Sequence, residues 1–129
     1  MNWLYGLMLL HFNSSDKLLK SDKIQSACIN ERDQKIWNTT GKVNFREYMN
    51  SCGSSCIGNY DCTVVCVKKA ENYSDTCCSC FGDLGKCSVK NCFTKCFSGD
   101  TPPCEECISE KCDNSFTNCS GLDVPSPKK

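Results

Sequence analysis

The sequence predicts a small all-α protein in which disulfides replace much of the hydrophobic core. Cysteine accounts for 15 of the 129 residues, a density typical of disulfide scaffolds in short secreted chains. The apolar fraction of 40% includes those cysteines, and only about 28% is left without them, which is little for a core. The cysteines also recur three or four residues apart, the spacing of one helix face. These observations predict disulfide-rich helical hairpins in tandem, preceded by an extended N-terminal arm.

Residues 1–14 begin with the apolar run MNWLYGLMLLHF. The run is shorter than the roughly 18 residues that a transmembrane helix needs. It resembles the apolar part of a secretory signal peptide, although no Lys or Arg precedes it and no A-x-A-like cleavage site follows. A truncated or atypical signal peptide is the favoured interpretation. The alternative is a retained tag of residues 1–12 that docks on a partner or a membrane surface, with Trp3 and Tyr5 suited to an interface.

A shift in cysteine content divides the rest of the chain. Residues 15–50 contain only Cys28 and form the expected arm, whereas the other fourteen cysteines lie in the module of residues 51–122. Residues 123–129 form a proline-containing tail. Residues 1–50 as a whole are the expected contact for a protein partner.

Three stretches suggest the structure that leads into the module. SSDKLLKSDKIQSAC predicts a short helix that begins at Ser15, and ERDQKIWNTTGK reads as a connection. NFREYMNSCGSSC carries apolar residues and cysteines at helical spacing, so it predicts a helix that enters the module.

The module contains an internal repeat: a CxxxC pair, a polar loop and a CxxC pair. The two copies are Cys62, Cys66, Cys77 and Cys80, and Cys92, Cys96, Cys104 and Cys107. Each copy reads as a helical hairpin, and antiparallel pairing across it gives the expected disulfides Cys62–Cys80, Cys66–Cys77, Cys92–Cys107 and Cys96–Cys104. The sequence leaves seven cysteines without an assigned partner: Cys28, Cys52, Cys56, Cys78, Cys87, Cys112 and Cys119.

Helix limits in the module follow from capping residues. Ser74 or Asp75 is expected to start one helix, and Asp100 or Thr101 followed by Pro102 to start another. The helix that contains Cys77 is expected to run on towards Cys96, although Gly82 and Gly85 weaken it. Gly121 is the expected stop of the last helix.

An odd number of cysteines leaves at least one unpaired or bonded to another chain. Cys78 is adjacent to Cys77 and faces another side of the helix, while Cys28 is remote from the other cysteines, so these two are the candidates. A buried free thiol and an intermolecular disulfide are the two explanations.

The sequence shows no pattern for ordinary catalysis. The only histidine, His11, lies in the N-terminal apolar run, so Ser-His-Asp and Cys-His sites have no base. We therefore expect no enzymatic activity, no cofactor and no metal site. The competing class is a thiol–disulfide redox or zinc-binding protein, because Cys77/Cys80 and Cys104/Cys107 are CxxC pairs.

Charge and sequons bear on the compartment and the partner. Fifteen basic and fifteen acidic residues are interspersed, so no basic stripe exists and nucleic-acid binding is not expected. N-x-[ST] sequons occur at Asn13, Asn38, Asn72 and Asn118, of which Asn38 and Asn72 are the candidate glycosylation sites.

Four phenylalanines of the module supply most of its large apolar surface: Phe81, Phe93, Phe97 and Phe116. We expect three of them in the core, and an exposed one would mark a contact surface.

The segment CFGDLGKCSVKNCFTKC, with the later CEEC and CSGL, resembles cysteine-rich helical modules of uncharacterised extracytoplasmic proteins of unicellular eukaryotes. The resemblance covers roughly residues 52–122 and implies an extracytoplasmic module without implying a reaction. The sequence thus predicts a non-enzymatic structural or protein-binding module that is extracellular or in an organelle lumen, not cytosolic. It is either secreted or a lumenal accessory subunit of a membrane complex, with a photosystem as one setting.

Overall fold

A computed structural model of the chain describes residues 25–125, and this part of the protein is all-α. Its elements are α2 (Glu31–Ile36), the π-helix η1 (Trp37–Gly41), α3 (Phe45–Cys56), α4 (Tyr60–Glu71), α5 (Asp75–Cys96) and α6 (Pro102–Ser120). The predicted fold class is confirmed. The apolar N-terminal run, the helix expected from Ser15 and the sequon at Asn13 lie outside the described residues.

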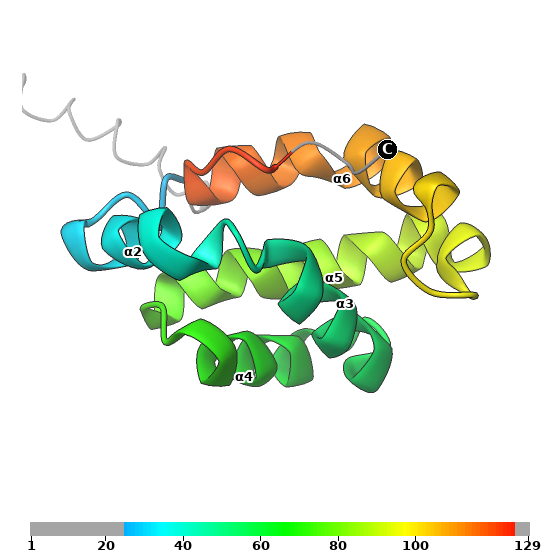
Figure 1. The fold of residues 1–129 in the computed structure, drawn as a ribbon, viewed down its shortest axis with the longest axis horizontal. Helices are drawn as coiled ribbons and strands as arrows, with labels where there is room; N and C mark the ends of the chain where they lie inside the picture. The colour runs from blue at the N-terminus through cyan, green and yellow to red at the C-terminus, as the bar shows by residue number, and fades with distance from the viewer. Residues whose placement is uncertain (1–24, 126–129) are drawn as a thin grey trace, which may run out of the picture.

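Helix α5 is the centre of the arrangement, with α6 on one side and α4 on the other (Figure 1). The chain reverses direction between α5 and α6, so these two helices are antiparallel neighbours along their length. Helix α3 packs against α4 and reaches α5 as well. Two antiparallel, disulfide-linked helix pairs, α3/α4 and α5/α6, are therefore present, and α4 and α5 pack together between them. The second pair is a predicted hairpin, whereas the first was predicted between the helices that contain Cys62 and Cys80.

The caps explain where the helices begin and end. The side chain of Ser74 accepts a hydrogen bond from the Cys77 N–H and starts α5, and Thr101 does the same for α6 through the Cys104 N–H. In each case the observed cap is one of the two residues that the sequence predicted. Gly121 ends α6 at φ 81°, in the left-handed region where glycine has no steric cost, which confirms the expected stop.

Helix α5 continues through both glycines, and their lack of a side chain is what lets α4 approach. A β-carbon at Gly82 would lie 2.6 Å from Cγ2 of Val64, and one at Gly85 would lie 3.1 Å from Thr63. At Gly82 a methyl group would require Val64 or the helix to shift, and at Gly85 it would require Thr63 to give by a few tenths of an ångström. The glycines therefore serve packing. They lower the intrinsic helix propensity of α5, but they allow α4 to pack closely against it.

We expect Gly82→Ala to lower the free energy of unfolding by about 1–3 kcal/mol, because overpacking against Val64 outweighs the helix propensity that alanine gains. Gly53→Ala in α3 is the matched control, since a β-carbon there meets no atom within 4 Å. That variant should be stabilised by up to about 1 kcal/mol. Denaturant unfolding of both variants measures the difference, and stabilisation by Gly82→Ala would contradict the proposed role.

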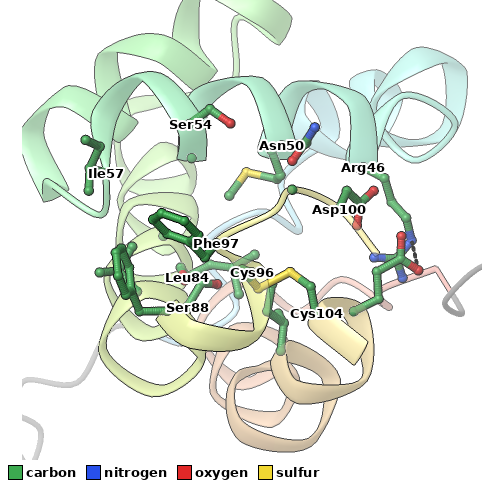
Figure 2. A pocket seen from close by; sticks show the side chains of 18 of the residues that line it. Arg46, Asn50, Ser54, Ile57, Leu84, Ser88, Cys96, Phe97, Asp100 and Cys104 are labelled. Atoms are coloured by element: carbon green, nitrogen blue, oxygen red, sulfur yellow. Dashed lines mark hydrogen bonds and ion pairs between the residues drawn. A yellow bond between two sulfur atoms is a disulfide. The ribbon is translucent and has the colours of Figure 1, made fainter. Parts of the chain in front are cut away.

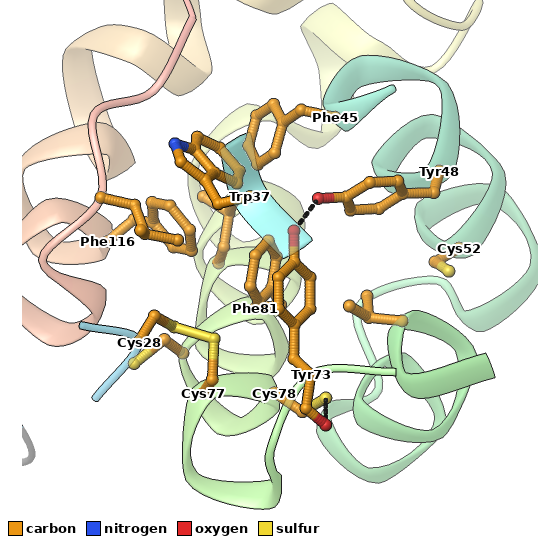
Figure 3. Close-up of a cluster of buried hydrophobic side chains, with 14 of the residues drawn as sticks. Cys28, Trp37, Phe45, Tyr48, Cys52, Tyr73, Cys77, Cys78, Phe81 and Phe116 are labelled. Carbon is orange, nitrogen blue, oxygen red and sulfur yellow. Dashed lines mark hydrogen bonds between the residues drawn. A yellow bond between two sulfur atoms is a disulfide. The ribbon is translucent and has the colours of Figure 1, made fainter. Parts of the chain in front are cut away.

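The core is an aromatic cluster centred on Phe81 (Figure 3). Its ring centroid lies 4.9 Å from that of Tyr73 and 4.9 Å from that of Phe116. Phe45 and Tyr48 complete the contacts at 6.2 and 6.1 Å. Only Phe81 and Phe116 of the four module phenylalanines are buried, so the expectation of three was wrong: Phe45, Tyr48 and Trp37 fill the space instead.

Residues 28–48, which belong to the expected arm, contribute to this same core. Cys28, Trp37, Phe45 and Tyr48 are all buried in it. The carboxylate of Asp33, which is fully buried, accepts hydrogen bonds from the backbone N–H and the hydroxyl of Ser74 at the start of α5. Cysteine density therefore does not mark where the packed part of the chain begins.

Candidate binding groove

A groove with a cavity volume of about 430 Å³ opens between α3, the C-terminal half of α5 and the start of α6 (Figure 2). We call it the Phe97 groove. Its walls come from α3, from α5 beyond Leu84, from the loop around Gly99 and from the first turns of α6. A volume of this size falls in the range of ordinary ligand pockets.

One end of the Phe97 groove is apolar and exposed. Ile57, Phe93 and Phe97 line it with 66%, 49% and 76% of their surfaces accessible. The rings of Phe93 and Phe97 meet edge to face at 5.8 Å between centroids, and Figure 2 shows Phe97 and Ile57 at this end of the groove. Large apolar side chains grouped in this way on a monomer surface are typical of contact sites.

The backbone of α5 changes course just before the two phenylalanines. Cys92 has φ −130° and ψ 16°, outside the helical region, within a helix that is otherwise continuous to Cys96. Disulfides on either side of Phe93, Cys92–Cys107 and Cys96–Cys104, hold this segment against α6. The exposed rings therefore lie on a covalently fixed support.

Ile57 adopts an unfavourable backbone conformation. Its φ and ψ of 49° and 50° place it in the left-handed region at the end of α3, where a β-branched residue is a genuine outlier. The adjacent disulfide Cys56–Cys62 closes the turn to α4. Two thirds of the residue is exposed, so burial of the side chain does little to offset the strain.

The opposite end of the groove is polar. Arg46 Nε lies 3.9 Å from Oε1 of Glu105, which is only 5% exposed, and Arg46 Nη2 donates to the carbonyl of Pro125 at 2.6 Å. Asp100 also lines this end. The Phe97 groove is thus amphipathic along its length, with an aromatic end and a charged end.

The disulfides between α5 and α6 form a ladder of four rungs: Cys80–Cys119, Cys87–Cys112, Cys92–Cys107 and Cys96–Cys104. The structure thus contains both bonds that were predicted for the second repeat. Successive rungs are seven, five and four residues apart on α5 and seven, five and three apart on α6. Nearly equal intervals are what antiparallel helices require, since each rung must lie opposite its partner.

The bonds predicted for the first repeat, Cys62–Cys80 and Cys66–Cys77, are wrong. Cys62 pairs with Cys56 and Cys66 with Cys52, so α4 is cross-linked to α3. Val64 and Thr63 of α4 lie against Gly82 and Gly85 of α5, whereas Cys62 and Cys66 bond to α3. Cys52 and Cys56 of α3 are four residues apart, as are Cys62 and Cys66 of α4, so the two pairs mirror each other across these antiparallel helices.

The two candidates for an unpaired thiol have different fates. Cys28 forms a disulfide with Cys77, so the expectation that Cys28 is unpaired or bonded to another chain was wrong. Cys80 forms a disulfide with Cys119. Cys78 is the free cysteine, and it is fully buried, with its Sγ 3.7 Å from the carbonyl oxygen of Tyr73. Burial raises the pKa of the Cys78 thiol to about 11. Of the two explanations offered for an odd cysteine, the structure contains the buried free thiol.

We expect Cys78 to resist alkylation in the native protein. With a pKa near 11 its thiolate fraction at pH 8.5 is about 100-fold lower than that of an ordinary cysteine, and burial blocks the reagent as well. Iodoacetamide with intact-mass detection should therefore add no group to native protein and one group after denaturation without reductant. Rapid labelling of native protein, absent in Cys78→Ala, would contradict this.

The CxxC motifs do not close on themselves. Cys77 and Cys80 bond to Cys28 and Cys119, and Cys104 and Cys107 bond to Cys96 and Cys92. A CxxC redox centre cycles between a dithiol and a disulfide within the motif, which this connectivity does not provide. Among residues 25–125, no group of three or more His, Cys, Asp or Glu side chains is placed to hold a metal ion.

Comparisons with protein-family models, curated proteins and solved structures gave no match to this chain. No family is therefore identified, and the resemblance noted in the sequence reduces to a cysteine-rich, all-helical small domain with seven disulfides. Seven disulfides indicate an oxidising compartment. In the described part of the chain, no helix is both long enough and apolar enough to cross a membrane.

Proposed function

We propose that the protein is a non-enzymatic protein-binding module of an oxidising compartment, which receives an apolar segment of a partner protein in the Phe97 groove. Seven disulfides keep the helices fixed, and the binding surface needs no catalytic group. The module is secreted or is a lumenal accessory subunit of a membrane complex, a photosystem being one such setting.

The observation that carries this proposal is Ile57, an exposed β-branched residue held in the left-handed region. Glycine or asparagine would relieve the backbone strain at this position, which costs roughly 1–2 kcal/mol. A strained and exposed apolar side chain that points into a groove is expected where contact with a partner outweighs stability.

A partner polypeptide fits the groove better than a small ligand does. The cavity could enclose a small apolar molecule, but Phe97 and Ile57 extend from its rim with most of their surfaces accessible. A partner chain would cover this rim, and aromatic residues at the centre of a covered patch typically supply much of the binding energy. The part of α3 from Phe45 to Asn50, which belongs to the expected contact region of residues 1–50, lines the same groove.

Site-specific photo-crosslinking tests the proposal. The full chain, carrying a photoreactive phenylalanine analogue at position 97, is irradiated in the compartment where the protein resides. We expect one protein adduct from position 97 and none from the same analogue at Val65, which is 57% exposed but lies outside the groove. Ile57→Gly should abolish the adduct while raising the free energy of unfolding by about 1 kcal/mol.

Three results would contradict the proposal. An adduct between two copies of this chain would identify a dimer interface instead. An adduct with a small apolar molecule alone would identify a carrier site. An adduct that survives Ile57→Gly would show that the strained side chain has no part in binding.

A further inference from the structure

Three sequons lie in the described residues, and all are at the end of the molecule opposite to the exposed apolar end of the Phe97 groove. Asn38 lies in η1 beside the end of α4, because the hydroxyl of Thr40 donates to Oε1 of Glu71 at 2.6 Å. Asn72 ends α4, and Asn118 lies near the end of α6. Helix α5 starts at this end and lines the groove from Leu84 onward, so the exposed apolar end of the groove at Phe93 and Phe97 lies roughly 30 Å along the helix from Asp75 (Figure 1).

The triplet at Asn72 has a structural explanation. Asn72 takes the left-handed conformation that ends α4, with φ 60°, and asparagine is one of the residues that tolerate it. Ser74, the third residue of the triplet, is the N-cap of α5 and is bonded to Asp33. Both residues are therefore accounted for by helix capping, and this sequon by itself gives little evidence of modification.

The triplet at Asn38 lacks such an explanation. The Asn38 side chain is exposed, and among residues 25–125 it has no hydrogen-bond partner. It lies within a helical turn, where asparagine is a poor choice because its side chain competes with the backbone. Thr39, by contrast, donates to the carbonyls of Lys35 and Ile36, and Thr40 to Glu71. Asn38 is thus the one member of its triplet without a contact of its own.

We propose that Asn38 carries an N-linked oligosaccharide. In the transfer, Nδ2 of Asn38 bonds to the anomeric carbon of a lipid-diphosphate-linked oligosaccharide donor. The bond from that carbon to the diphosphate oxygen breaks, and the amide loses one proton to the base of the host transferase. The exposed Asn38 side chain leaves its amide accessible to the transferase, and the hydrophilic chain would cover the end remote from the exposed apolar end of the groove. Such a glycan places the protein on the secretory route, since seven disulfides alone fit any oxidising compartment.

Site-resolved mapping of the natural protein tests this directly. The full chain is purified from its own source and treated with peptide N-glycosidase in ¹⁸O-labelled water, which converts each glycosylated Asn into labelled Asp. We expect the label at Asn38. Unlabelled Asn38 in the purified protein overturns the proposal.

Variants expressed in the same cells show whether the sequon directs the modification. Asn38→Gln and Thr40→Val should each abolish the label at position 38, and only Thr40→Val also removes the bond to Glu71. Thr40→Ser keeps a hydroxyl, and Thr39→Ala changes only the middle residue, so both should retain the label. A label at Asn38 that persists in Thr40→Val would show that N-linked glycosylation is not its source.

Discussion

Replacing Cys28 and Cys77 together by alanine should lower the free energy of unfolding by about 4 kcal/mol. Their disulfide closes a loop with a sequence separation of 49 residues, and in the chain-entropy model the stabilisation grows with the logarithm of loop length. Both cysteines are also fully buried beside the aromatic core, so their loss removes packing. Denaturant unfolding monitored by circular dichroism measures the change.

The matched control is the double variant Cys56→Ala and Cys62→Ala. This disulfide spans only six residues, so the same model gives about 2 kcal/mol. The comparison separates loop length from the general effect of removing a disulfide. Equal destabilisation of the two variants, or a larger loss of unfolding free energy in the Cys56/Cys62 variant, would contradict the larger stabilisation expected from the Cys28–Cys77 disulfide.

Phe81→Ala should cost about 3–5 kcal/mol, the range for a fully buried phenylalanine. Phe81 stacks on Tyr73 and meets Phe116 edge to face, so truncation opens a cavity in the middle of four other rings. The disulfides cannot close this cavity, because they fix the helices at their present separation. Thermal and denaturant unfolding should both show the loss.

Phe97→Ala is the control for Phe81→Ala, because it removes the same phenyl ring at an exposed position. Phe97 is 76% exposed, so its truncation should change the unfolding free energy by no more than about 0.5 kcal/mol. It should nevertheless weaken partner binding if the Phe97 groove has the proposed role. A large stability loss in Phe97→Ala would mean that this ring packs in solution and is not a free contact surface.

More of the disulfide connectivity could have been predicted from the sequence than the internal repeat indicates. The two copies of the repeat are matched in the same chain direction. Antiparallel helices instead require cysteine intervals on one helix that match those on the other read backwards. Cys80, Cys87, Cys92 and Cys96 have nearly the same intervals as Cys119, Cys112, Cys107 and Cys104 read backwards. Mirrored spacing was therefore the signal that could have assigned all four rungs, and it also favours pairing Cys52 and Cys56 with Cys66 and Cys62.

The groove could not be predicted in the same way. Helix starts at Ser74 and Thr101 follow from local capping chemistry, which a few adjacent residues determine. Exposure of Phe93 and Phe97 depends instead on the change of direction at Cys92 and on how far α3 lies from α6. Burial of Phe45 in their place likewise depends on segments distant in sequence. The spacing of residues within one helix does not indicate how α3, α5 and α6 pack against one another.

The positions of two disulfides determine how the molecule would respond to a pulling force. Tension applied between residues 27 and 120 would pass from Cys28 to Cys77, along three residues to Cys80, and across to Cys119. Only that short stretch of backbone, at most about 10 Å long, would carry the load. The segments 29–76 and 81–118, including the Phe97 groove, are mechanically bypassed. A protein anchored at one terminus and attached to a moving partner at the other would keep its folded shape at forces that extend ordinary helical domains.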